Sequence, residues 1–82
     1  MPTIACILHG SLEDSIVGPH DSNRTTLHFD QQPSVDDILA HLKLDRDYLQ
    51  FFLADGLYVE LEDWDKPVHG KLFQLWPRMS GG

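Results

Sequence analysis

The fold is organised around residues 33–43, PSVDDILAHLK, which carry the clearest local signal in the chain. Ser34 is predicted to cap the N-terminus of a helix, and Asp37, three residues later, completes a capping box. Acidic residues in the first turn complement the positive end of the helix dipole, and Lys43 suits the last turn. The apolar residues recur at helical spacing: Val35, Ile38, Leu39 and Leu42. We therefore expect one helix that packs this stripe against a sheet.

Two strands are predicted before this helix. Residues 3–8, TIACIL, are apolar on both alternating faces, which is typical of a central strand with Cys6 as a small core residue. Residues 24–30, RTTLHFD, alternate as a half-buried strand does and should pair antiparallel with the first. The connection between them, residues 10–23, is long and rich in turn residues. Three apolar residues are expected to hold it against the body or a partner: Leu12, Ile16 and Val17.

Three more strands are predicted after the helix. They comprise residues 48–54 (YLQFFLA), residues 57–59 (LYV) and residues 71–76 (KLFQLW). The dipeptide Asp55-Gly56 favours a tight hairpin turn between the first two of these strands. Residues 61–66, LEDWDK, show no clear period, so we predict a short 3₁₀-like segment that Trp64 anchors to the core.

The order strand, strand, helix, strand, strand, strand restricts the topology. A hairpin followed by a crossover helix returns parallel to one of its own strands through a right-handed connection. The compact solution places the first and last strands side by side in the middle of a mixed sheet of four to five strands, curled around the helix. We therefore predict an α+β fold of the ubiquitin-like β-grasp type, with one domain over residues 1–76 and a flexible tail over residues 77–82.

Charge and composition narrow the possible partners and compartments. The 82 residues include 13 acidic and six basic side chains, and the net charge of −7 disfavours binding to nucleic-acid phosphates. No apolar run approaches the roughly 18 residues that a membrane span needs. Cys6 is the only cysteine, which fits a reducing compartment. We expect a cytoplasmic protein that is a monomer when free, and that binds neither nucleic acid nor membrane.

The last six residues are Pro77-Arg78-Met79-Ser80-Gly81-Gly82. Glycine adds nothing to a core and loses the most backbone entropy on ordering, so a terminal pair is either a frayed end or a functional one. Two residues without a Cβ would let the terminal carboxylate pass through a narrow channel. They would also let another protein and a nucleotide approach the carboxyl carbon closely. The tail is therefore the candidate reactive segment.

Parts of the second half resemble the ThiS/MoaD sulfur-carrier family. The segments that carry the resemblance are residues 51–59 (FFLADGLYV), Trp64-Asp65, Gly70 and residues 75–82 (LWPRMSGG). The resemblance covers residues 34–82 well, and the Gly-Gly tail is its specific part. The sequence departs from the family in three places: Asp55 where Asn is usual, Lys71 after Gly70 where Asp is usual, and a longer connection over residues 10–23.

The resemblance implies a carrier rather than an enzyme with its own active site. An E1-like enzyme of the ThiF/MoeB type would use ATP to adenylate the carboxylate of Gly82. A sulfur donor would then replace AMP and leave a thiocarboxylate, which passes sulfur to an acceptor synthase in cofactor or metabolite biosynthesis. Gly82 is thus the reactive residue, and Gly81 keeps the tail slim. The chain would bind no cofactor itself, because ATP and the sulfur donor act through the partner enzyme.

The resemblance also implies an apolar docking patch on the open face of the sheet. Its matching positions are Tyr58, Trp76 and either Leu8 or Ile7, because the sequence does not fix the register of the first strand. Trp76 can also be interpreted as an ordinary core residue, although tryptophan is a favoured interface anchor. Arg78, beside the tail, is a candidate for pairing with an acidic partner, and it can equally be interpreted as a solvated surface residue.

Several alternatives stay open at the level of sequence. The histidines (His9, His20, His28, His41 and His69) include no i, i+4 pair on a helix, and no cysteine pair accompanies them, so we predict no metal site. Besides a free sulfur carrier, the chain fits the small subunit of a molybdopterin-synthase-like complex or a ubiquitin-like modifier joined to lysines through Gly82. A β-grasp interaction module with an idle tail is the fourth interpretation.

Overall fold

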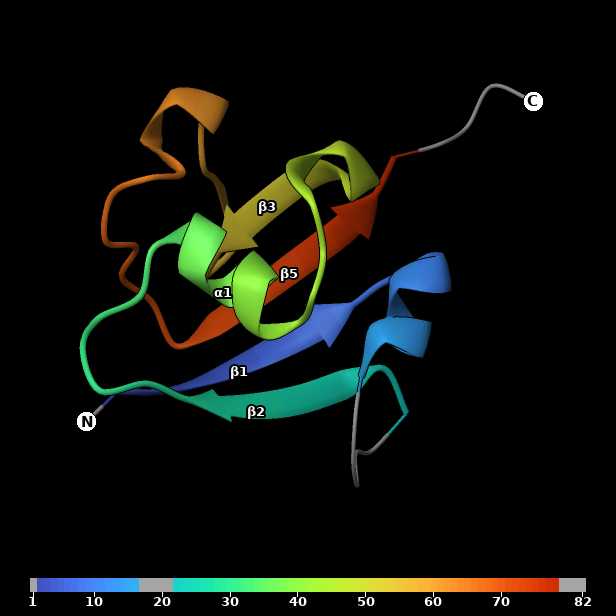
Figure 1. Cartoon of the computed structure of the whole chain (residues 1–82), viewed down its shortest axis with the longest axis horizontal. Coiled ribbons are helices and arrows are strands. Elements are labelled where there is room, and N and C mark those ends of the chain that lie inside the picture. Colours follow the sequence, from blue (N-terminus) through green and yellow to red (C-terminus); the bar gives the residue numbers. More distant parts are fainter. Residues whose placement is uncertain (1, 17–21, 79–82) are drawn as a thin grey trace.

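A five-stranded mixed sheet with one α-helix on one face forms the part of the chain that the computed structural model describes, residues 2–16 and 22–78 (Figure 1). The elements are β1 (Thr3–Leu8), η1 (Gly10–Ser15), β2 (Arg24–His28), α1 (Val35–His41), η2 (Arg46–Tyr48), β3 (Leu49–Ala54), β4 (Leu57–Tyr58), η3 (Leu61–Asp63) and β5 (Leu72–Pro77), where η marks a 3₁₀ helix. None of the helices in these ranges is long and apolar enough to cross a lipid bilayer.

Strands β1 and β5 lie side by side in the centre of the sheet and run parallel, as the order of elements predicts (Figure 1). The strand order is β2-β1-β5-β3-β4, and every other neighbouring pair is antiparallel. The predicted antiparallel pairing of the first two strands is therefore confirmed. So is the α+β class, with two strands before the helix and three after it.

The core lies between the sheet and α1. Ile4, Cys6 and Leu8 of β1 are completely or almost completely buried, because β1 is central and alternate residues of a strand point to the same face. Burial raises the pKa of Cys6 to about 12, so the thiolate is strongly disfavoured at neutral pH. The prediction that Cys6 is a small core residue is confirmed.

Helix α1 begins where the sequence predicts. The Ser34 hydroxyl accepts a hydrogen bond from the Asp37 N–H at 3.0 Å, and the Asp37 carboxylate accepts one from the Ser34 N–H at 3.0 Å. Together these two bonds form the predicted capping box. All four apolar stripe residues are buried in the core: Val35, Ile38, Leu39 and Leu42.

The helix ends earlier than the sequence suggests. Lys43, predicted in the last turn, lies two residues beyond His41 and has a φ of 59°, in the left-handed region. The N–H of Leu44 donates to the C=O of Leu39 at 2.8 Å, and the N–H of Lys43 donates to the C=O of Ala40 at 3.1 Å. These two bonds close the helix as a Schellman motif does, although glycine is the usual residue at the left-handed position.

The hairpin turn at Asp55-Gly56 also ties β3 to the start of β5. Both residues have positive φ, 50° and 84°, as a type I′ turn requires. The carboxylate of Asp55 accepts hydrogen bonds from the N–H of Leu72 at 2.9 Å and from the N–H of Lys71 at 3.0 Å. These bonds lower the pKa of Asp55. The sequence predicts the turn, but it does not predict that the aspartate side chain also binds the backbone at the start of β5.

We expect the stability of the fold to fall in acid because of Asp55. Its pKa is depressed in the folded state, so its contribution is present above the ordinary aspartate value near 3.9 and is lost as the pH falls through the folded value. Asp55→Asn keeps a turn-compatible residue with one acceptor oxygen but does not titrate. Between pH 7 and pH 3, the free energy of unfolding measured in urea should fall more for the wild type than for this variant. Equal falls would contradict the stabilising role assigned to the Asp55 carboxylate.

Several strand ends differ by one or two residues from those predicted, and the strand predicted over residues 24–30 already ends at His28 as β2. Tyr48 belongs to η2, Val59 follows β4, and β5 begins after Lys71 and includes Pro77. Tyr48 leaves the strand because its N–H donates to the C=O of Asp45 at 3.0 Å, closing a turn of 3₁₀ helix. Val59 still donates its N–H to the C=O of Phe52 at 2.9 Å, so the hairpin continues weakly past β4.

Two predicted anchors are confirmed. Trp64 is buried and its indole N–H donates to the C=O of Val59 at 3.0 Å, which fixes the 3₁₀ segment η3 to the body. In the long connection after β1, Leu12 within η1 and Ile16 directly after it are buried. Val17, the third residue predicted to hold this connection, lies outside the described residues.

Candidate functional site

The two residues predicted to be reactive, Gly81 and Gly82, lie outside the described residues. The described part of the predicted tail is held to the sheet. Pro77 is the last residue of β5 and lies opposite Leu49 of β3, and the N–H of Arg78 donates to the C=O of Tyr48 at 2.9 Å. The strand therefore continues one residue past its predicted end, and it leads to Arg78 between the ends of β1 and β3.

Three exposed aromatic side chains cross the open face of the sheet, which is the face away from α1. Trp76 of β5 lies directly opposite Phe51 of β3, and the Phe51 ring meets the Tyr58 ring of β4 edge to face at a centroid distance of 5.8 Å. Their exposed fractions are 38% for Trp76, 45% for Phe51 and 50% for Tyr58. We call these three residues the aromatic row. The structure thus brings together Tyr58 and Trp76, both predicted site residues, and adds Phe51.

Histidine 9 extends the aromatic row toward β1. Its imidazole ring stacks on the indole ring of Trp76, with a centroid distance of 3.6 Å and an interplanar angle of 9°. Its Nε2 atom lies 3.0 Å from the side-chain oxygen of Gln74. From the sequence, His9 was weighed only as a possible metal ligand. Its place beside Trp76 follows from the parallel pairing of Leu8 with Leu75, which the sequence did not fix.

Leu8 does not belong to the docking patch, contrary to one of the two predictions for the first strand. It is completely buried, with an exposed fraction of 0%. Ile7, the alternative that the sequence leaves open, points to the other side of β1, is partly exposed and lies opposite Gln74 of β5. The correction follows from strand alternation, because only one of two consecutive residues can face the open side.

A β-bulge in β3 shapes the root of the tail. Leu49 lies opposite Pro77 and Phe51 lies opposite Trp76, so Gln50 is an extra residue without a partner in the register. Bulges of this kind redirect side chains at the ends of pairing segments. Here the consecutive residues Gln50 and Phe51 are both exposed.

An apolar hollow of about 280 Å³ lies beside this bulge. It is lined by His9, Gly10, Gln50, Phe51, Trp76 and Pro77. Gly10 is required here, because its φ is 57° and a Cβ at this position would lie 3.0 Å from the Cγ of Pro77. The hollow therefore combines a close backbone approach with exposed aromatic walls, and it can accept an apolar side chain of a partner.

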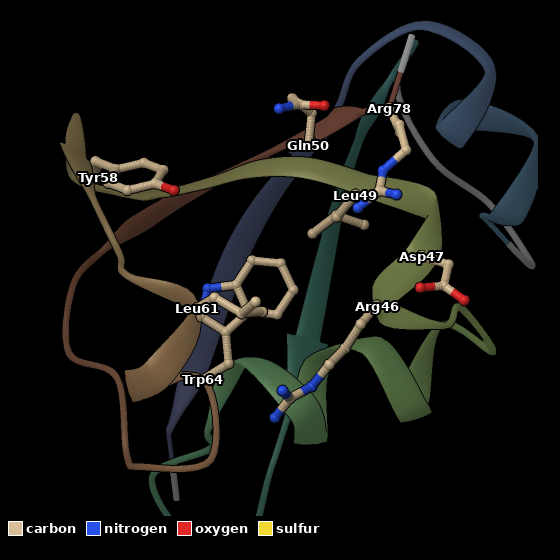
Figure 2. A pocket seen from close by; sticks show the side chains of 8 residues that line it. All are labelled: Arg46, Asp47, Leu49, Gln50, Tyr58, Leu61, Trp64 and Arg78. Atoms are coloured by element: carbon tan, nitrogen blue, oxygen red, sulfur yellow. The ribbon is translucent and has the colours of Figure 1, made fainter. Parts of the chain in front are cut away.

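A second concave site, which we call the edge pocket, lies where β4 has ended and β3 continues. Its volume is about 220 Å³, and its lining includes Arg46, Leu49, Gln50, Tyr58, Trp64 and Arg78. Figure 2 shows the indole ring of Trp64 in the middle of the pocket, the hydroxyl of Tyr58 turned inward from β4, and Arg78 reaching down from the end of β5.

The two arginines of the edge pocket differ in their partners. Arg46 donates through Nε to the carboxylate of Asp36 at 2.8 Å, and a second N–H of its guanidinium makes the bond bidentate. The bond to Asp36 raises the pKa of Arg46, whose guanidinium carbon lies 5.8 Å from the centroid of the Trp64 ring. Arg78 forms no ion pair with any other described residue. Arg78 therefore presents its charge to solvent at the pocket rim.

The described residues offer two surfaces that can bind a partner, the aromatic row with its hollow and the edge pocket. Within residues 2–16 and 22–78, no three histidine, cysteine, aspartate or glutamate side chains gather as a metal site would require. Compared with known protein families, with curated proteins and with solved structures, the chain has no significant match. The function is therefore inferred from the two surfaces, the strand β5 and the sequence of the tail.

Proposed function

We propose that this chain is a β-grasp sulfur carrier. In this proposal an E1-like enzyme adenylates the carboxylate of Gly82, and a sulfur donor then converts it to a thiocarboxylate. The acceptor is a synthase in cofactor or metabolite biosynthesis. The observation that carries the proposal is the exposed aromatic row, whose Trp76 lies near the end of β5, the strand leading into the Gly-Gly sequence.

The sheet topology supports this proposal. β5 is paired with β1 as far as Leu75 and with β3 as far as Pro77, close to where the tail begins. A carrier needs such a rigid base, because an adenylating enzyme that grips the folded body must place the carboxylate near its nucleotide within a fraction of an ångström. The helix on one face of the sheet leaves the other face open for docking (Figure 1).

The aromatic row supports the docking half of the proposal. Tryptophan and tyrosine are enriched among residues that dominate binding energies at interfaces, and they are rarely left exposed together without a use. Trp76 is the next-to-last residue of β5, so a partner bound over it lies beside the root of the tail. The apolar hollow between Trp76 and Pro77 offers that partner a place for one apolar side chain.

The chemistry requires only the carboxylate of Gly82 from this chain. One carboxylate oxygen attacks the α-phosphorus of ATP, which forms an acyl adenylate and releases pyrophosphate. Hydrosulfide then attacks the carbonyl carbon, AMP leaves with the bonding electron pair, and the thioacid loses a proton. The net result replaces one carboxylate oxygen by sulfur. Glycine suits this position because it has no side chain to obstruct the attack on its carbonyl carbon.

Intact-mass spectrometry tests the proposal. The protein is first weighed after purification from its source, and the mass must place the C-terminus at Gly82. It is then incubated with the ThiF/MoeB-type enzyme of the same organism, ATP, Mg²⁺ and sulfide. We expect the mass to rise by the difference between one sulfur and one oxygen, with no rise when ATP is omitted. An unchanged mass, with an enzyme that modifies its known carrier under the same conditions, would refute the proposal.

Removing the indole of Trp76 should weaken docking without unfolding the protein. We expect Trp76→Ala to raise the KM for the carrier by about tenfold or more, because an interface anchor contributes on the order of 2 kcal/mol. The KM is measured by ATP–pyrophosphate exchange. Leu57→Ala is the matched control, since Leu57 is 73% exposed but lies outside the aromatic row. Equal KM values for both variants would contradict this docking surface.

A further inference from the structure

Part of the outer edge of β3 is uncovered. β4 is only two residues long, and its pairing with β3 reaches no further than Leu53. After the bond from Val59 to Phe52, the chain turns away into η3. The outer edge of β3 from Leu49 to Phe51 therefore lies beside no other strand of the described chain. An uncovered strand edge is a template on which an extended peptide can add as a further strand.

The edge pocket lies directly beside this uncovered edge and has an apolar floor. Leu49 and Trp64, which form part of its lining, belong to the hydrophobic core. Leu61, on the wall, is 54% exposed and adds apolar surface to the pocket. A peptide strand on β3 would direct alternate side chains toward and away from this floor.

The rim of the pocket presents one positive charge, that of Arg78, which pairs with no other described residue. Two of the six basic residues of the chain line the pocket, although the net charge of the chain is −7. Asp47 also lines it, and Arg46 is already paired with Asp36, so Arg78 supplies the available positive charge. Guanidinium and carboxylate groups form strong, charge-assisted hydrogen bonds when they meet at a partly desolvated site.

A second copy of this chain does not satisfy these requirements. None of the five described strands contains an aspartate or a glutamate, so edge-to-edge pairing of two copies would bring no acidic strand residue to Arg78. A small inorganic anion would leave the apolar floor and the strand edge unused. An extended segment of another protein can use the edge, the floor and the charge together.

We propose that the uncovered edge of β3 and the edge pocket bind an extended acidic peptide segment of a partner protein. The segment adds as a strand beside residues 49–51, places an apolar side chain on Trp64 and directs a carboxylate to Arg78. This site lies at the sheet edge rather than on the aromatic row, with Tyr58 lining its boundary. The proposal goes beyond the sulfur-carrier function and stands or falls independently of it, because its test requires neither ATP nor an adenylating enzyme.

The test is an NMR titration of the full chain with short synthetic peptides. The first probe is an acetylated and amidated peptide of alternating valine and glutamate, and its matched control replaces each glutamate by lysine. We expect the glutamate peptide to shift the Trp64 indole N–H and the Gln50 amide, and to bind at least about tenfold more tightly than the lysine peptide, as a charge-assisted bond requires. Equal binding of the two peptides, or no shift at these groups, overturns the proposal.

Two variants locate the binding. Arg78→Gln should weaken binding of the glutamate peptide by about tenfold, because it removes the charge at the rim. Arg24→Gln removes another exposed charge, from β2 at the opposite edge of the sheet, and should leave the affinity unchanged. Unchanged amide spectra elsewhere show that both variants are folded. Equal losses of affinity in the two variants would indicate non-specific electrostatic attraction and would contradict the proposed site. Chemical-shift changes confined to the aromatic row would also contradict it.

Discussion

Phe73→Ala is expected to lower the free energy of unfolding by about 3–5 kcal/mol. Phe73 is completely buried in the central strand β5, and its ring lies 5.4 Å from that of Phe52, which is also completely buried. Its removal loses apolar contact area and leaves a cavity that the two neighbouring strands prevent from closing. A chain of this size has a total stability of roughly 4–12 kcal/mol, so the variant should lose most of its margin or unfold.

Urea unfolding followed by circular dichroism measures this effect, and Phe51→Ala is the matched control. Phe51→Ala removes the same type of side chain, but from an exposed position in the adjacent strand β3. It should cost well under half as much as Phe73→Ala, because its ring is already partly in water. The two variants thus separate stability from docking. A similar cost for both would mean that the open face is covered in the folded protein, which would contradict the proposed docking surface.

Gly81→Val is expected to slow adenylation of Gly82 by about 100-fold, the loss that follows when a reacting group is displaced by about 1 Å. Valine places a branched Cβ next to the reacting carboxylate and restricts the backbone that must lie within the partner's channel. Because residue 81 lies four residues beyond the end of β5, the free energy of unfolding should not change. Loss of rate without loss of stability is the signature expected of a reactive tail.

The rate is measured by ATP–pyrophosphate exchange with saturating carrier. Ser80→Val is the control, since it places the same side chain one residue further from the carboxylate and should slow the reaction less. If Gly81→Val exchanges at the same rate as the wild type, adenylation does not require a residue without a side chain at position 81. That result would favour the alternative interpretation, a binding module whose tail is idle.

The elements of the fold could be predicted because their signals are local. A capping box and a helical apolar stripe predict α1, and Asp55-Gly56 predicts the hairpin between β3 and β4. Both depend on residues within a few positions of one another, so they do not require knowledge of the tertiary structure. The central position of β1 could also be predicted, because apolar residues on both alternating faces favour a central strand over an edge strand.

The candidate site was predicted only in part because it depends on register. Tyr58 and Trp76 were identified, but the choice between Leu8 and Ile7 required the alignment of β1 with β5. The same alignment places His9 on Trp76, a contact between residues far apart in the sequence. The bulge at Gln50 belongs to the pairing of β3 with β5, and the edge pocket depends on where β4 stops, which no local pattern in residues 57–61 reveals.

The parallel pairing of β1 with β5 joins segments from opposite ends of the described chain. Contacts so distant in sequence form slowly, because the chain between them must lose loop-closure entropy first. During synthesis on the ribosome, β1, β2 and α1 emerge early, but the sheet lacks its middle until β5 has been translated. A nascent chain therefore has neither a complete core nor a complete open face until β5 has been added, and partners encounter this surface only after that point.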